Sequence, residues 1–248
     1  MTPLRRWFRP FCPQDAVHDT SLGELLTVPG LTQADILNAC VSVPGQEYIS
    51  LLGYRGGESL MKYPKITRDK AVELFVSLRY LADYIILDCA AVFEADPASF
   101  VGIEIADRVL RLGTANLKGI SYYQTHTPML ADSRFDKERH QTAIGYLKVG
   151  QDWESASGQY GGVDYVLPYV AELEQQDNER ALFLPLQTQE SAPYSAEINR
   201  IVAALFGLQT APAVKEKGVK KKGAGSAVPL QAAKGGLKLP FARNRGEF

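Results

Sequence analysis

The sequence predicts an α/β fold in which helices cover a mostly parallel β-sheet, and three observations lead to this fold class. Residues 67–82 begin with Thr67 and carry apolar side chains at spacings of three and four, which predicts an amphipathic helix with an N-cap. Residues 83–89 follow at once and are almost entirely apolar, as in a parallel strand buried on both faces. The same alternation of helix and strand then recurs, which is typical of layered α/β proteins.

The remaining elements are expected from the same two patterns. Short apolar runs predict strands at residues 48–53, 108–112, 142–148 and 164–167, the last ended by Pro168. Helical periodicity predicts helices near residues 32–40, over 116–130 and over 191–206.

Composition predicts one main globular domain. The chain has 248 residues, of which 46% are hydrophobic, and this is enough to bury a full core. The sequence contains no stretch of about 18 apolar residues, and residues 1–13 lack the uninterrupted apolar run of a signal peptide. Three widely spaced cysteines disfavour a disulfide framework, so we expect a reducing, cytoplasmic setting.

The C-terminal residues 209–248 differ in composition from the rest. They are rich in Lys, Gly and Pro and poor in large apolar side chains, so we expect a disordered tail after a domain of residues 1–208. From Lys215 onward, seven Lys and two Arg stand against Glu216 and Glu247, which gives this part a charge of +7 and the rest −8. Such a tail attracts DNA or an anionic membrane, but a merely solubilising tail has the same composition.

One carboxylate, Asp88, closes the apolar run of residues 83–89. Ligands of open parallel sheets bind outside the carboxyl ends of the strands. Asp88 in this position is similar to a Walker B carboxylate, which holds Mg²⁺ beside the phosphates of a nucleotide. Because apolar strands ending in Asp are common, a purely structural Asp88 stays open on this observation alone.

The order of several short segments resembles the ParA/MinD-like (CobQ/CobB/MinD/ParA) family of P-loop ATPases. In the first half of the chain these segments are residues 21–26 (SLGELL), 48–53 (YISLLG) and 80–89 (YLADYIILDC). The family runs in this order from a short helix, through a strand followed by Gly, to a helix that leads into the Walker B strand.

The second half of the chain continues the resemblance. Residues 106–110 (ADRVL) are similar to the next strand of the family, and residues 114–117 open the helix that follows. Residues 166–169 (VLPY), followed by Glu172, resemble the turn that passes near the adenine base. The similarity extends over residues 21–207, and its order is more specific than any single segment.

The resemblance implies the three-layer fold of MinD-like (SIMIBI) P-loop NTPases, with ATP and Mg²⁺ as cofactors. Asp88 would be the metal ligand, and Cys89, Pro168 and Tyr169 would join it around the nucleotide. Complete relatives form homodimers around ATP and act in plasmid partition, in the positioning of septa or pili, or in conjugation.

The phosphate-binding loop of the family is missing, since no Gly-Lys dipeptide occurs in the sequence. The chain would therefore lack the first βαβ unit and should not hydrolyse ATP alone. The neighbour of the Walker B strand would be absent too, which leaves a central strand unpaired. We expect either a fragment from a late start codon or a relative that a partner completes.

Other chemistries have less support in the sequence. His18, His126 and His140 do not form a metal-binding spacing, and neither a GxSxG nor a GxGxxG motif is present. Cys89 is expected to be a small buried side chain rather than a nucleophile. The alternative function is a non-enzymatic protein that docks a protein partner and uses its basic tail to reach DNA or membrane.

Overall fold

A computed structural model describes residues 21–43, 45–55, 58, 63–147, 153–179, 181–182 and 184–207. The expected tail of residues 209–248 lies outside the described residues. The helices are α2 (Leu22–Leu25), α3 (Gln33–Ala39), α4 (Arg68–Leu78), α5 (Pro97–Ile105), α6 (Leu117–His126), α7 (Trp153–Ser157), α8 (Ala171–Glu179) and α9 (Ala192–Phe206). The strands are β1 (Val41–Val43), β2 (Gln46–Leu51), β3 (Val109–Thr114), β4 (His140–Leu147) and β5 (Tyr165–Pro168).

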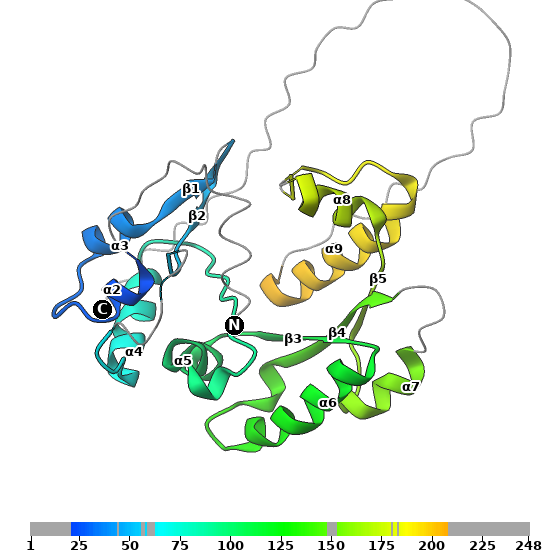
Figure 1. Ribbon diagram of the computed structural model, residues 1–248, viewed down its shortest axis with the longest axis horizontal. Coiled ribbons are helices and arrows are strands. Elements are labelled where there is room, and N and C mark those ends of the chain that lie inside the picture. The colour runs from blue at the N-terminus through cyan, green and yellow to red at the C-terminus, as the bar shows by residue number, and fades with distance from the viewer. Residues whose placement is uncertain are drawn as a thin grey trace, which may run out of the picture. The chain divides into compact units, whose positions relative to one another are not determined.

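The main sheet has the order β3-β4-β5, and all of its strand pairs are parallel (Figure 1). Val109 lies opposite His140 at one end of the β3–β4 ladder, and Thr114 lies opposite Gly145 at the other. Helix α6 follows β3 and α7 follows β4, so each parallel step crosses over through helical chain. The carboxyl ends of the strands therefore share one edge of the sheet.

Helices cover both faces of this sheet. Ala143 and Ile144 are neighbours on β4, both fully buried, and successive side chains of a strand point to opposite faces. Ile144 packs with Tyr123 of α6 and with α7, whereas Ala143 packs with Ile201 of α9. The predicted three-layer α/β fold class is confirmed.

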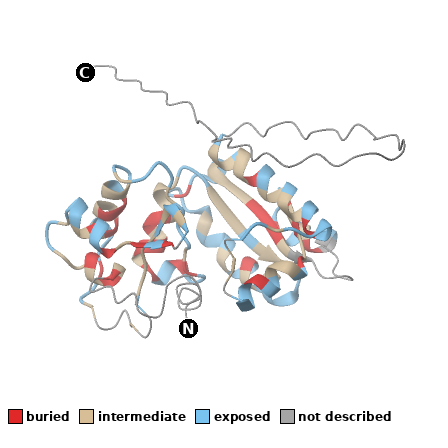
Figure 2. Ribbon diagram, turned by 90° about the horizontal axis from the view of Figure 1, so that it is seen from above, coloured by how far each residue is buried: buried red, intermediate tan, exposed pale blue. Residues whose placement is uncertain are grey.

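The first helices form a second packed group. Leu25 of α2, Ile36 of α3, Leu74 of α4 and Val101 of α5 share one hydrophobic cluster, and all are nearly inaccessible to solvent. Figure 2 shows buried residues in red both on these helices and on the strands of the parallel sheet. Thr67 caps α4 as expected, because its hydroxyl accepts a hydrogen bond from the backbone N–H of Lys70. No described helix has the length and apolar character needed to cross a bilayer.

Two strand predictions need correction. Residues 83–89 form no strand in the described chain, and Ile86 is 81% exposed instead of buried. An apolar run becomes a strand only where a neighbour completes its hydrogen bonds, and no described strand lies in register with it. The strand expected at residues 48–53 exists as β2, but it pairs antiparallel with β1 in a separate two-stranded sheet.

The other predicted elements are confirmed with shifted ends. They are α3, α4, β3, α6, β4, β5 and α9. Three helices were not expected from the sequence: α5, α7 and α8.

Candidate functional site

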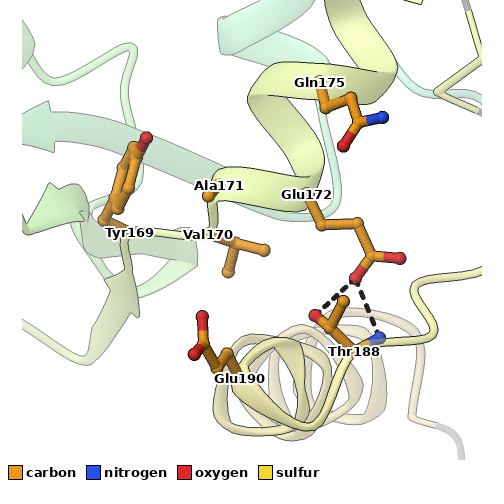
Figure 3. A pocket seen from close by; sticks show the side chains of 7 residues that line it. All are labelled: Tyr169, Val170, Ala171, Glu172, Gln175, Thr188 and Glu190. Atoms are coloured by element: carbon orange, nitrogen blue, oxygen red, sulfur yellow. Dashed lines mark hydrogen bonds between the residues drawn. The ribbon is translucent and has the colours of Figure 1, made fainter.

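A pocket of about 330 Å³ lies directly after β5, at the carboxyl edge of the parallel sheet. This is the edge where ligands of open α/β sheets bind. Figure 3 shows the side chains that line it. They come from the turn after β5, from the start of α8 and from the chain ahead of α9: Tyr169, Val170, Ala171, Glu172, Gln175, Thr188 and Glu190.

Glu172 holds the two sides of this pocket together. Its carboxylate accepts hydrogen bonds from the backbone N–H groups of Gln187 and Thr188, at 2.7 and 3.1 Å. It also accepts from the hydroxyls of Thr188 and Ser191, at 2.7 and 2.5 Å. These donors stabilise the ionised form and lower the pKa of Glu172 to about 2, with the Ser191 hydroxyl as the largest contribution.

The remaining lining groups define the chemistry of the pocket. Tyr169 donates its hydroxyl proton to Glu174, which raises the pKa of the phenol. Glu190 and Gln175 add acceptor oxygens, and none of the described lining residues is Lys or Arg. An aromatic ring beside carboxylate and amide acceptors suits an uncharged ring that carries N–H donors, such as adenine, and disfavours phosphate.

Asp88 and Cys89 lie on the chain between α4 and α5, and neither lines the pocket. Asp88 is exposed, yet the atoms packed around it desolvate the carboxylate and raise its pKa. The Cys89 sulfur lies 3.9 Å from the carbonyl oxygen of Ser99, and burial raises the pKa of the thiol to about 11. Cys89 was expected to be a small buried side chain and is half-buried instead, and a thiol with a raised pKa is a poor nucleophile.

The chain just after Asp88 is fixed to the start of α5. The backbone N–H of Ala90 donates to the Ser99 hydroxyl at 2.8 Å, and that hydroxyl donates to the Asp96 carboxylate at 2.5 Å. Asp96 is also the N-cap of α5, because it accepts from the backbone N–H of Ser99. The chain two residues after Asp88 is therefore anchored to the cap of the following helix.

The described residues fit a nucleotide only in part. Magnesium in nucleotide sites takes one or two carboxylates together with phosphate oxygens, and Asp88 can supply one such ligand. No group of three or more His, Cys, Asp and Glu side chains able to hold a metal ion occurs among the described residues. With no Gly-Lys loop in the sequence, the residues present do not fit the phosphates.

Of the four residues expected around the nucleotide, only Tyr169 lines the pocket, and Pro168 directly precedes it as the last residue of β5. Thr188, Gln175 and Glu190 were not expected at the site. They lie in polar segments without periodicity, and nothing in the spacing indicates that Glu172 bonds to Thr188.

Comparisons with known proteins were made by sequence and by structure. No protein-family model and no curated protein matches the sequence. The structure is similar to that of the MinD cell division protein of Aquifex aeolicus, with a TM-score of 0.57 and 17% identity, over 79% of this chain and 78% of that one.

A second similar structure is that of a ParA family ATPase from Chlorobium tepidum TLS. Its TM-score is 0.58 at 13% identity, and the match covers 78% of each chain. Both matches extend over most of the compared chains. The chain therefore has the ParA/MinD-like fold of the P-loop ATPases.

Proposed function

We propose that this protein is a ParA/MinD-like switch protein that recognises the base of a nucleotide weakly and does not hydrolyse ATP by itself. The observation that supports this function is the pocket at the carboxyl end of β5, which begins at Tyr169 in a fold shared with MinD and ParA structures. Its acceptor-rich lining suits a base and not a triphosphate.

The remaining nucleotide contacts follow from this assignment. Asp88 supplies a magnesium ligand, while Pro168 with Tyr169 shapes the turn beside the base and Cys89 follows the metal ligand. Without a phosphate-binding loop, the affinity for ATP should be millimolar or weaker, and the cellular role would be positioning, partition or conjugation as a homodimer.

The test is a titration of the full chain with ATP, with and without Mg²⁺, followed by NMR. We expect weak binding that changes little with Mg²⁺, and no release of phosphate. Tyr169→Ala should weaken the binding further, whereas Tyr80→Ala should not, because Tyr80 is 77% exposed and lies outside the pocket. Tight, Mg²⁺-dependent binding or ATP hydrolysis would contradict the proposal.

A second candidate is a non-enzymatic interaction protein. It is favoured by large apolar side chains that stand exposed on the described surface, such as Ile86 at 81% and Leu112 at 64%. In this function the basic tail tethers the protein to DNA or to an anionic membrane. Salt-sensitive binding to DNA or to phosphatidylglycerol vesicles that disappears when residues after Gly207 are deleted would support it, and no binding at low salt would exclude the tether.

A further inference from the structure

Arg111 is a half-buried cation on strand β3 that has no carboxylate partner in the described chain. Its Nη2 donates to the hydroxyl of Thr142 on β4 at 2.5 Å, which fixes the guanidinium against the sheet. None of the ion pairs formed between described residues includes Arg111. An arginine side chain keeps its charge in proteins, so a positive charge is held here without a counter-charge from the described residues.

Two buried donors at this place also lack acceptors. The Nε of Arg111 and the hydroxyl of Tyr123 on α6 are both closed to solvent, and neither has a hydrogen-bond partner among the residues that the structure describes. Tyr123 as a whole is only 5% exposed. Buried donors are nearly always bonded in proteins, because an unbonded donor has lost its water without compensation. Both donors therefore need an acceptor that the described chain does not supply.

Arg111 and Tyr123 lie against the same face of the sheet. The Cζ of Arg111 is 5.8 Å from the centroid of the Tyr123 ring. Burial raises the pKa of the Tyr123 phenol, whereas the positive charge of Arg111 acts in the opposite direction, so the phenol oxygen lies within the field of the guanidinium. Thr142 and Ile144 point to one side of β4 by alternation, and Ile144 packs with Tyr123. Helix α6 covers this side of the sheet (Figure 1).

The other ionisable groups near Arg111 do not neutralise its charge. His140, the first residue of β4, is half-buried, and burial together with the charge of Arg111 lowers its pKa. Its imidazole is therefore neutral at neutral pH. Asp136 acts on His140 in the opposite direction, but its carboxylate is paired with Arg139 at 3.0 Å. One positive charge remains, and a single negative charge would balance it.

We propose that Arg111 and Tyr123 bind a small monovalent anion, for which chloride is the probe. The anion accepts hydrogen bonds from the Nε of Arg111 and from the hydroxyl of Tyr123, and its charge balances the guanidinium. Phosphate and sulfate fit less well, because one charge is unpaired and both donor atoms are closed to solvent. A water molecule would bond to the donors but leave the charge unbalanced.

This anion site is separate from the pocket after β5. Arg111 lies opposite Thr142, in the half of the β3–β4 ladder that begins at Val109 and His140. The pocket lies beyond the other ends of the strands, and neither Arg111 nor Tyr123 lines it. The inference therefore does not depend on nucleotide binding, and either one can fail without the other.

The test is the melting temperature of the full chain at neutral pH and fixed ionic strength, as chloride replaces methanesulfonate. An anion that binds only the folded chain raises this temperature, by about 3–6 °C at a tenfold excess over its dissociation constant. We expect a saturable rise for the wild type and for Arg108→Met, because Arg108 is exposed. Arg111→Met, which removes the same charge, should abolish the rise.

Tyr123→Phe distinguishes a bound anion from a bridging water. It keeps the ring that packs edge to face against Tyr160 and removes only the hydroxyl. In methanesulfonate this variant should melt at least as high as the wild type, because the hydroxyl has no partner there. In chloride its rise should be much smaller than that of the wild type, and it should broaden the chloride NMR line less.

Three results would overturn the proposal. The first is a wild type whose melting temperature does not respond to chloride. The second is a rise that Tyr123→Phe and Arg111→Met leave unchanged, or that Arg108→Met removes as well. The third is a Tyr123→Phe variant that melts lower than the wild type by the same amount in both salts, since an uncharged bridge such as water would then join the two donors.

Discussion

At the scale of single residues, ionisable groups show how local packing sets chemistry. Neighbouring atoms shift the ionisation of Cys89 and of Glu172 in opposite directions. Burial disfavours the charged form of Cys89, whereas four hydrogen-bond donors favour the charged form of Glu172. Their pKa values move accordingly, to about 11 and about 2.

Cys89 should react slowly with thiol reagents at neutral pH, because only the thiolate is reactive. In a chain with Cys12 and Cys40 replaced by serine, the labelling rate should rise about tenfold per pH unit from pH 7 to 9.5 without a plateau. A stopped-flow disulfide-exchange assay measures this rate. If the labelling rate reached a plateau at or below a pH equal to the pKa of an ordinary thiol, Cys89 would be activated, contrary to the structural assignment.

Glu172→Gln should lower the melting temperature at neutral pH, because the neutral amide binds the donors of residues 187–191 less strongly. The folded-state pKa of Glu172 lies below its ordinary value of 4.5, so its stabilisation is present above that value and is lost as the pH falls toward about 2. The difference in melting temperature between wild type and variant should therefore be constant above pH 5 and shrink toward pH 2.

The matched control for Glu172 is Asp177→Asn on the same helix. The Asp177 side chain makes no hydrogen bond with the described residues, so its replacement should leave the melting temperature nearly unchanged. A pH-independent difference for Glu172→Gln would contradict the assigned role.

At the scale of elements, the turn between β3 and α6 leaves no room for a side chain at Gly119. Asn116 caps α6 by accepting from the backbone N–H of Gly119 at 2.9 Å. A Cβ at Gly119 would lie 2.7 Å from the carbonyl oxygen of Thr114 and 2.4 Å from its hydroxyl. Glycine is required here because the helix begins directly against the end of the strand.

Gly119→Ala should lower the free energy of unfolding by about 1–3 kcal/mol, because the new methyl group overlaps backbone. This loss should appear although alanine favours a helix over glycine by about 1 kcal/mol. Gly158→Ala is the control, since no atom lies within 4 Å of an added Cβ, and we expect a change within about 0.5 kcal/mol. Urea unfolding of the two variants measures both free energies of unfolding. Equal losses for Gly119→Ala and Gly158→Ala would contradict the steric overlap at residue 119.

The elements also show which patterns carry information. Helix α4 and strands β3, β4 and β5 were predictable, because each carries periodic or continuous apolar residues. Helix α8 was not, since its sequence AELEQQDNE has no apolar stripe. Helix α5 does carry a sequence signal, namely Asp96 as N-cap followed by Pro97 in the first turn.

At the scale of the whole molecule, the fold class was predictable because helices and strands alternate along the chain. The exposure of residues 83–89 was not predictable, because burial depends on neighbours that composition does not specify. For the pocket, Tyr169 was expected from the resemblance. The bridge from Glu172 to residues 187–191 joins segments 15 to 19 residues apart, and local patterns cannot reveal it.

The central claim is that this ParA/MinD-like fold offers a base pocket without a phosphate site. The most direct measurement compares the dissociation constants of adenosine and of ATP with Mg²⁺ for the full chain. If only the base is recognised, the two constants should agree within a few fold, and both should be millimolar or weaker. ATP binding that is about a hundredfold tighter, equivalent to roughly 2.7 kcal/mol from the phosphates, would contradict this account.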